Sequence, residues 1–552
     1  MKRKPQDLSN EAIQSIWRKG IAEAANHSVV KQQLERQEGE LLPRFAEHYE
    51  KLKTLPRRVR RSLQRRWRQS LAGIALLLVL GQTPALAGTI NVEGGCTLID
   101  AIGSANKDTA VGACQAGSGD DTIVLPKGST QTLTTVNNTN VVGYNGLPAI
   151  TSTITIQGND ATIRRAHDAP DFRIFYVDLG ASLTLQETTV SGGRQVIAGA
   201  HQPAGGAIFN VGTLNLIDST IFGNAAGFGG GIFNFHGALR LTNSTISGNK
   251  ATTVSGGGVY NVYGAVNATN STITENSAVY GGAMNTRTTI TRSGECPIAC
   301  THAYDQGPVI LTKTTISDNT AGQEGGGIFH IGGTAKLVKS TLTGNSAGTT
   351  GGGVYTGNNV PSENTPLTEL VNSTVSGNSA TRGGGVYVSS LLPGSARVLN
   401  STITQNSAQK GGGVYVESDG ASITFEQALI SGNTASSTAG EVFVGADGLV
   451  TAGNFNLFGH SGRADVEGFT PGPTDIVPNN SLEAILNTNL ANNGGQTLTH
   501  ALVEHSPAVD AVTDGTCPPP ATDQRNVKRP QDGNGDGAAI CDIGSFERRP
   551  GE

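Results

Sequence analysis

The chain has 552 residues and a formal net charge of −5, with 75 glycines, 6 cysteines and only 5% aromatic residues. The charge is unevenly distributed: residues 1–70 contain 17 Lys and Arg against 8 Asp and Glu, whereas residues 71–552 contain 22 against 36. Because an acidic body repels phosphates, the composition argues against nucleic acid as a partner. The acidic composition is consistent with binding of divalent cations, or simply with solubility.

The first 87 residues form two segments in front of the acidic body. Residues 1–56 have helical composition and some amphipathic spacing, which predicts a polar helical extension; the alternative is a translation start downstream of Met1. Residues 57–87 combine clustered arginines, the apolar run 71–80 and Ala85-Leu-Ala87, which predicts a signal peptide cleaved after Ala87. The apolar run is about half of the ~20 residues that a membrane span needs. We therefore expect an exported mature chain, extracellular or outer-membrane-associated and without an integral membrane domain; an uncleaved anchor is the alternative.

All six cysteines follow Ala87, which in an exported chain favours disulfides. Their clustering predicts the local pairs Cys96–Cys114, Cys296–Cys300 and Cys517–Cys541, with zinc as the alternative. Residues 88–200 are predicted to form an N-terminal cap and early coils. Their segment Cys96-Thr-Leu-Ile-Asp-Ala-Ile102 resembles the CSLREA-type N-terminal segment of exported β-helix proteins.

Residues 201–465 repeat themselves with a period near 25 residues. In each unit a Gly-Gly-(Gly/Ala) block precedes or includes a recurring small aliphatic position: Ile208, Ile232, Val259, Ala283, Ile328, Val354, Val386 and Val414. A second pattern, aliphatic-x-x-Asn, keeps step with it and ends at Asn224, Asn249, Asn276, Asn319, Asn345, Asn378, Asn406 and Asn433. A fixed period of this size is typical of repeat proteins in which each unit packs against its neighbours.

The repeat unit is built from short β-branched runs interrupted by Gly and Asn, with no helical period. About 25 residues supply one coil, so we predict an all-β, right-handed parallel β-helix of roughly a dozen coils, about 60 Å long from the ~4.8 Å strand spacing. The recurring Asn is expected to stack at one inner turn, where its amide hydrogen-bonds the Asn or the backbone of neighbouring coils.

The motif Gly205-Gly-Ala-Ile-Phe-Asn210, with the aliphatic-x-x-Asn pattern, resembles the repeats of polymorphic outer-membrane proteins. Those repeats pair a GGA(I/L/V) motif with FxxN, and here the aromatic position of FxxN is aliphatic in every unit. The resemblance implies a bacterial secreted right-handed parallel β-helix of the pectin-lyase-like fold. It implies a fold and no particular activity.

Residues 466–552 lose the period and are predicted to form a C-terminal cap region. Asn492–Leu502, Ser506–Asp510, Asp523-Gln-Arg525 and Cys541–Glu547 resemble the choice-of-anchor Q region of bacterial surface proteins. Within this region, Asp532, Asn534 and Asp536 alternate as in a calcium-binding loop, and Asp542 or Glu547 would have to substitute for the missing twelfth-position Glu. The pattern predicts a Ca²⁺ site, and a polar Gly-rich turn is the alternative.

Two acidic residues are the candidates for catalysis. Glu275 and Asp318 directly precede the recurring Asn in consecutive repeats, so stacking would bring their carboxylates near the ~5 Å separation of a retaining glycosidase pair. The insert 286–308 lies between them and would overhang such a cleft. Exposed turn residues are the alternative interpretation.

An aromatic column follows the aliphatic column by one residue: Phe209, Phe233, Tyr260, Phe329, Tyr355, Tyr387 and Tyr415. Strand alternation sends the two columns to opposite faces of the sheet. If the aliphatic residues point inward, the aromatic residues form an external ladder that could contact sugars or another protein. In the reverse arrangement they form the core, and the sequence leaves both open.

These patterns predict a secreted or cell-surface β-helix rod that acts in adhesion or in contact with the cell envelope without catalysis. Its expected partners are a polysaccharide or a cell-envelope or host surface. The alternative is an enzyme, a polysaccharide lyase or glycoside hydrolase on the same scaffold, because fold alone does not determine activity. Charged residues are sparse in the repeats, which favours the first hypothesis.

Overall fold

The structure is a computed structural model that describes residues 88–140, 142–196, 203–287, 307–357, 367–389 and 394–552. The chain divides into two compact units, Met1–Ala87 and Gly88–Glu552, and the described residues all belong to the second. The predicted helical extension, the signal peptide and the Cys296–Cys300 pair lie outside the described residues, as does most of the insert 286–308.

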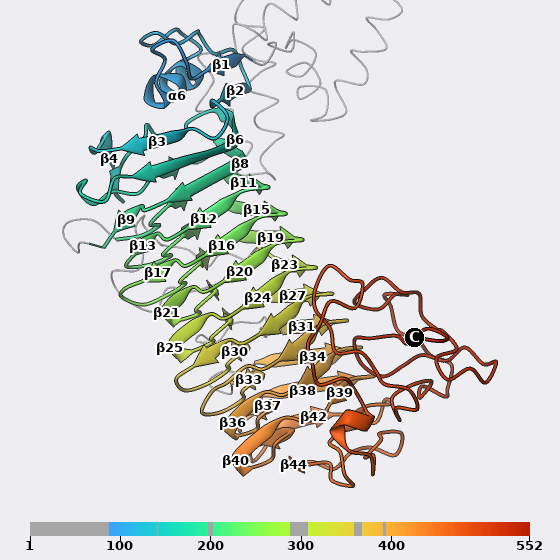
Figure 1. Cartoon of the computed structure of the whole chain (residues 1–552). Coiled ribbons are helices and arrows are strands. Elements are labelled where there is room, and N and C mark those ends of the chain that lie inside the picture. The colour runs from blue at the N-terminus through green and yellow to red at the C-terminus, as the bar shows by residue number, and fades with distance from the viewer. Residues whose placement is uncertain (1–87, 141, 197–202, 288–306, 358–366, 390–393) are drawn as a thin grey trace, which may run out of the picture. The chain divides into compact units, whose positions relative to one another are not determined.

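The second unit is a parallel β-solenoid whose coils stack along one axis (Figure 1). One of its sheets contains 11 strands, one from each coil. The prediction of an all-β parallel β-helix is therefore confirmed, with about 11 coils where the period predicted roughly a dozen.

The regular coils contribute strands to four columns, numbered here in chain order through one coil, although the coil with residues 367–388 has no strand in column 4. Column 1 is the 11-stranded sheet, made of β7 (Phe175–Val177), β10 (Ile208–Asn210), β14 (Ile232–Phe235), β18 (Val259–Val262), β22 (Met284–Arg287), β26 (Ile328–Ile331), β30 (Val354–Gly357), β33 (Val386–Val388), β37 (Val414–Val416), β41 (Val442–Val444) and β44 (Val466–Glu467). Column 2 comprises β1 (Thr89–Asn91), β2 (Asp121–Val124), β11 (Thr213–Ile217), β15 (Ala238–Thr242), β19 (Ala265–Thr269), β23 (Val309–Thr312), β27 (Thr334–Val338), β31 (Leu367–Val371), β34 (Ser395–Leu399), β38 (Ser422–Glu426) and β42 (Leu449–Thr451).

Column 3 comprises β3 (Thr130–Leu133), β12 (Thr220–Phe222), β16 (Thr245–Ser247), β20 (Thr272–Thr274), β24 (Thr315–Ser317), β28 (Thr341–Thr343), β32 (Thr374–Ser376), β35 (Thr402–Thr404), β39 (Leu429–Ile430) and β43 (Leu457–Phe458). The long strands β6 (Thr153–Arg165) and β8 (Ser182–Ser191) pair with both columns 2 and 3. Column 4 comprises β9 (Arg194–Gln195), β13 (Ala225–Ala226), β17 (Lys250–Ala251), β21 (Ser277–Tyr280), β25 (Thr320–Glu324), β29 (Ser346–Ala347), β36 (Ser407–Lys410) and β40 (Thr434–Thr438).

Strand alternation and glycine explain why this sequence forms coils. Alternate side chains of each strand enter one continuous apolar core, which includes Ile232, Leu239 and Ile246 of a single coil. The Gly-Gly-Gly blocks lie where the backbones of neighbouring coils approach closely. A Cβ on Gly230 would lie 2.4 Å from the carbonyl carbon of Lys250, so no larger residue fits at this position.

The recurring Asn residues form the predicted ladder inside the stack. The eight residues from Asn224 to Asn433, listed above and called the Asn ladder from here on, are buried. The Nδ2 of each of the first seven rungs donates to the Oδ1 of the next rung at 2.8–3.0 Å. The backbone N–H of the same seven residues donates to the same Oδ1, so these buried groups are satisfied by the next coil. The prediction of a stacked, hydrogen-bonded ladder is confirmed.

The N-terminal coils are covered by the helix α6 (Leu98–Lys107). Thr97 caps the helix by accepting the Asp100 N–H at 3.1 Å, and Leu98 and Ile102 enter the solenoid core. The disulfide Cys96–Cys114 closes the segment around the helix, which confirms this predicted pair. Residues of the antiparallel hairpin β4 (Asn138–Asn140) and β5 (Gly143–Asn145) follow shortly afterwards.

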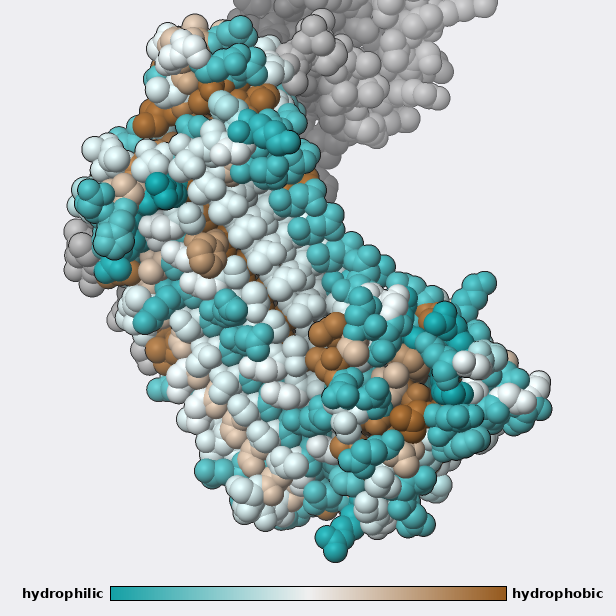
Figure 2. Space-filling view, in the orientation of Figure 1, coloured by the Kyte–Doolittle hydropathy of each residue, from teal (hydrophilic) through white to brown (hydrophobic). Residues whose placement is uncertain are grey.

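Residues 482–552, which begin with the 3-10 helix η2 (Leu482–Ala484), pack along the side of the stack beside β31 to β39 (Figure 1). They dock on the outward hydroxyl groups of column 3: Thr341 Oγ1 donates to the Leu498 carbonyl at 2.7 Å, and Thr374 Oγ1 donates to Gln524 Oε1 at 2.7 Å. The predicted Cys517–Cys541 disulfide is also present. Figure 2 shows that the face of the stack next to this region is pale, the colour of intermediate hydropathy. Among the described residues, none lies in a helix of the length and apolar character required to cross a bilayer.

Candidate functional site

The predicted catalytic pair lies on consecutive coils, as its sequence position implied. Thr274 of β20 pairs with Ser317 of β24, so Glu275 and Asp318 follow one above the other at exposed left-handed turns with φ of 56° and 55°. Neither carboxylate has an ion pair with any of the described residues. A catalytic role for this pair stays a prediction, because the insert expected to overhang it lies outside the described residues.

The predicted calcium loop forms a tight turn. Asp532 accepts the backbone N–H groups of Gly535 at 2.8 Å and Gly537 at 3.0 Å, and Asn534 and Asp536 accept further N–H groups within the loop. The Asp542 carboxylate is buried and accepts the N–H of Asp510 at 2.7 Å instead. The described residues contain no group of three or more His, Cys, Asp or Glu side chains placed to hold a metal ion. The structure thus gathers Asp532, Asn534 and Asp536 in one turn, and Ca²⁺ binding there stays a prediction.

The aromatic column lies on the outer face of column 1, while the aliphatic residues enter the core. Phe329, Tyr355 and Tyr387 are nevertheless at least 93% buried, whereas Tyr415 and Phe443 are partly exposed. Their rings stack along the axis with centroids 4.7–5.4 Å apart and planes within 22° of parallel. Because neighbouring rings cover each other's faces, the column offers mainly edges and hydroxyl groups outward. It is external to the main core, as one alternative predicted, but it forms a second apolar layer.

One coil interrupts the column, because Asn285 occupies the aromatic position of β22. The guanidinium of Arg287 lies in this gap, with its carbon 5.7 Å from the ring centroid of Tyr260 and 5.6 Å from that of Phe329. Cation–π contacts of this kind are favourable by about 0.5–2 kcal/mol. In this coil the guanidinium of Arg287 therefore takes the place of an aromatic ring and keeps the column continuous.

Charged and polar groups flank the five rings Phe329, Tyr355, Tyr387, Tyr415 and Phe443, which we name the aromatic strip. On one side, Arg382 lies over the ring of Tyr415 at 5.9 Å, and Lys410 lies over the ring of Phe443 at 5.1 Å. On the other side, Ser389 Oγ donates to Glu417 Oε2 at 3.0 Å. The aromatic strip thus runs between cations and a carboxylate over consecutive coils.

Electrostatics connect two carboxylates of this surface. Burial, and then the negative charge of Glu417, raise the pKa of Glu324. Burial and the same charge raise the pKa of Tyr387, whose phenol hydrogen-bonds Glu417. Tyr355 also has a raised pKa, through burial and the charge of Glu324. Glu324 and Glu417 therefore act on the same group of phenols, although they are 93 residues apart in the chain.

Sequence reasoning missed Glu324, Arg382, Lys410 and Glu417. Arg382 and Lys410 each directly precede a glycine block and Glu324 precedes another, whereas Glu417 follows an aromatic residue of the column by two positions. The signal was present in the alignment of the repeats, because equivalent positions of successive coils stack. Scanning each repeat position for charged residues would have placed all four on one surface.

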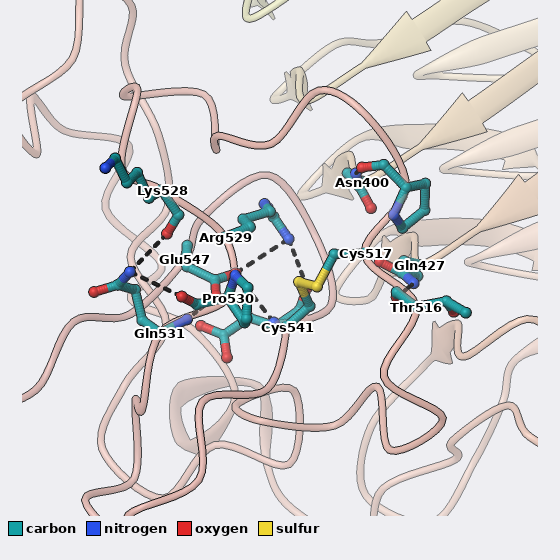
Figure 3. The surroundings of a disulfide bond; sticks show 12 residues. Asn400, Gln427, Thr516, Cys517, Lys528, Arg529, Pro530, Gln531, Cys541 and Glu547 are labelled. Atoms are coloured by element: carbon teal, nitrogen blue, oxygen red, sulfur yellow. Dashed lines mark hydrogen bonds and ion pairs between the residues drawn. A yellow bond between two sulfur atoms is a disulfide. The ribbon is translucent and has the colours of Figure 1, made fainter.

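Two buried charged residues of the C-terminal region pair with each other. Arg529 and Glu547, both with fully buried side chains, form an ion pair at 3.2 Å, and Figure 3 shows them beside the disulfide. Arg529 also donates to the carbonyl groups of Asp542 and Gly544. His500 is held between Ser376 at 2.8 Å and the Asn487 carbonyl. These groups resemble catalytic residues in type, but the partners of Arg529 and Glu547 give them a role in holding the C-terminal region together, and His500 docks it on the coils through Ser376.

A buried carboxylate ends the Asn ladder and gives the fold a pH dependence. Glu441 takes the place of the next rung, accepting Asn433 Nδ2 at 2.6 Å and the Gly432 N–H at 2.7 Å. Burial raises the pKa of Glu441 to about 8. The folded state therefore holds a proton that the unfolded state releases near its ordinary pKa, so stability is full at low pH and falls as pH rises from about 4.5 to about 8.

We expect Glu441→Gln to remove this loss. Between pH 5 and pH 8, the unfolding free energy of the variant should rise by a few kcal/mol relative to that of the wild-type protein. Chemical denaturation followed by circular dichroism at several pH values measures it. Since the variant also loses one acceptor, the slope with pH and not the offset is the test, and a constant difference would contradict the prediction.

Comparisons with protein-family models, with curated proteins and with solved structures returned no match for this chain. The resemblances of the repeats and of the C-terminal region thus gain no support from them. The assignment of function depends on the geometry described above.

Proposed function

We propose that this protein is an exported, non-catalytic β-solenoid rod that binds a polysaccharide of a cell envelope or host surface along its aromatic strip. The observation that carries the proposal is the continuity of the strip, which aligns ring edges, phenols and flanking charges along the axis. A linear polymer matches such a repeating surface better than a compact ligand does. The two disulfides are compatible with export.

The partly exposed end of the strip is the part best suited to contact a sugar chain. Tyr415 and Phe443 are accessible there, and Arg382 and Lys410 lie over their rings. Aromatic rings and charge-assisted hydrogen bonds are the groups by which proteins hold sugars in a defined orientation. The stacked, buried rings behind them supply rigidity.

A second candidate function is glycoside or polysaccharide cleavage. The observation in its favour is Glu324, whose pKa is raised by burial and then by the negative charge of Glu417, as a general acid requires. Against it, Ser389 and Tyr387 already engage the Glu417 carboxylate. We therefore place binding first.

The test uses the full chain and a panel of neutral and acidic polysaccharides, with binding measured by affinity electrophoresis and cleavage by the release of reducing ends. We expect Tyr415→Ala to weaken binding roughly tenfold, the scale of one lost aromatic contact of about 1–1.5 kcal/mol. Phe222→Ala is the matched control, because Phe222 is a half-exposed aromatic residue of column 3, away from the strip. It should change binding less than twofold.

Two outcomes would overturn the proposal. Cleavage that disappears in Glu324→Gln or Glu417→Gln would make the protein an enzyme with its site on the strip, and loss in Glu275→Gln or Asp318→Asn would move that site to the predicted pair. Absence of binding to every polysaccharide in the panel, with no cleavage, would exclude both functions.

A further inference from the structure

The C-terminal region contains a cavity whose chemistry is unrelated to the aromatic strip. Its volume is about 430 Å³, within the range of pockets that hold small ligands. The lining includes three cations, Arg525, Lys528 and Arg549, and the amide side chains of Asn493, Asn526 and Gln531. A cavity lined by cations and amides favours an anionic ligand with additional polar groups.

Arg525 lines this cavity and is held in place by several contacts. Its side chain is 1% exposed, and its Nε donates to Asp523 Oδ2 at 2.9 Å. The guanidinium carbon lies 3.4 Å from the ring centroid of Phe546, and Nη2 donates to the Glu547 carbonyl at 2.5 Å. These contacts hold Nη1 at the cavity in one orientation, so little entropy is lost when an anion binds it.

A carboxylate of the chain itself already uses this group. Glu552 Oε1 lies 2.6 Å from Arg525 Nη1 and 3.1 Å from Arg549 Nη2. Its Oε2 accepts the Arg549 backbone N–H at 3.1 Å, and its main-chain carbonyl accepts a hydrogen bond from the Arg548 guanidinium. The Glu552 carboxylate is thus held by Arg525 and Arg549, which both line the cavity, and its main chain is held by Arg548, which lies outside the lining.

The cavity also has polar groups that Glu552 does not occupy. Lys528 is exposed and makes no ion pair with any of the described residues, and Figure 3 shows its amine pointing away from the neighbouring Gln531. Gln531 donates its Nε2 to the carbonyls of Lys528 and Pro530, which leaves its Oε1 as an acceptor at the lining. A second acidic group therefore has the Lys528 ammonium available to it, and the Gln531 oxygen can accept a backbone N–H of the same peptide.

We propose that this cavity is a binding site for an acidic peptide segment of a partner, and that Glu552 occupies its glutamate position in cis. A partner's glutamate would displace Glu552 from Arg525 and Arg549, while a neighbouring acidic residue would pair with Lys528. The site goes beyond polysaccharide binding by the strip and does not depend on it. Since exposed charges take part, binding should weaken as salt rises.

The test compares the full chain with Glu552→Gln, using fluorescence anisotropy of a labelled acetyl-Pro-Gly-Glu-amide, which reproduces residues 550–552, and its Gln counterpart. We expect the variant to bind the Glu peptide roughly tenfold more tightly than the wild type, the scale of one charge-assisted hydrogen bond gained. Glu504→Gln is the matched control, because it removes the same charge from an exposed side chain of this region. It should bind as the wild type does.

Adding Arg549→Gln to Glu552→Gln should reverse the gain, and the Gln peptide should not bind either protein. Equal affinities in Glu552→Gln and Glu504→Gln would show that Glu552 is only a structural clasp and would overturn the proposal. Equal binding of the Glu and Gln peptides would do the same. Binding of an oligogalacturonide, without binding of the Glu peptide, would show that the ligand of the cavity is an acidic sugar and not a peptide.

Discussion

Replacing Arg529 with methionine is expected to destabilise the C-terminal region by about 3–5 kcal/mol, the usual result of removing one partner from a buried ion pair. The substitution leaves Glu547 without its cation and the Asp542 and Gly544 carbonyls without a donor. Hydrogen exchange with mass spectrometry should show lost protection over residues 482–552, the region that docks on column 3. The coils before β26 should keep theirs, since among the described residues the hydrogen bonds from this region to the coils begin at Lys339.

The double variant Arg529→Met/Glu547→Gln is the control for this prediction. Glutamine is uncharged at every pH and keeps one oxygen, which can accept one of the two N–H groups, those of Gln531 and Asp542, that Glu547 now accepts on separate oxygens. The second substitution should therefore recover part of the lost stability, which a double-mutant cycle quantifies. Additive losses would show that the pair contributes through packing alone.

Replacing Asn345 with alanine is expected to cost about 3 kcal/mol or more, because it leaves several buried groups unpaired. Its Nδ2 donates to the Ile316 carbonyl at 2.9 Å and to Asn378 Oδ1 at 2.9 Å. Its Oδ1 accepts both the N–H and the Nδ2 of Asn319. Chemical denaturation followed by circular dichroism measures the loss, and hydrogen exchange locates it.

Asn267→Ala is the matched control, because Asn267 presents the same side chain to solvent on column 2. It should change the unfolding free energy by less than about 0.5 kcal/mol, as surface substitutions usually do. In a stack where each coil contacts only its neighbours, the defect in Asn345→Ala should also remain local. Uniform loss of protection along all coils would contradict that view.

The repeats alone were sufficient to predict the solenoid and the ladder, for a reason that is local. A period near 25 residues made of β-branched runs, glycine blocks and a recurring Asn allows one arrangement in which every unit buries the same residues. Asn345 and its equivalents keep the same sequence position in each unit, so stacking necessarily brings them together. The pairs Cys96–Cys114 and Cys517–Cys541 followed from proximity in the chain.

The candidate site was predictable only in part. Alternation correctly placed Tyr387 and its equivalents on the face opposite the aliphatic column, if that column points inward. It contained no information on how far the rings are covered, because coverage depends on neighbouring coils and on side chains such as Arg287. Glu324 and Glu417 were missed because they occupy different positions of different repeats, and no single repeat contains both.

The sequence by itself therefore determined the coil, its inward residues, the Asn ladder and two disulfides, all of which depend on contacts at a fixed chain separation. Only the tertiary structure decided that residues 482–552 dock on the hydroxyl groups of column 3, and that Arg525 meets Glu552 at a cavity. It also decided that Glu441 follows the last rung, Asn433, and ends the ladder. These contacts join segments with no shared period, so the free energy of packing the whole chain, and not a local pattern, selects them.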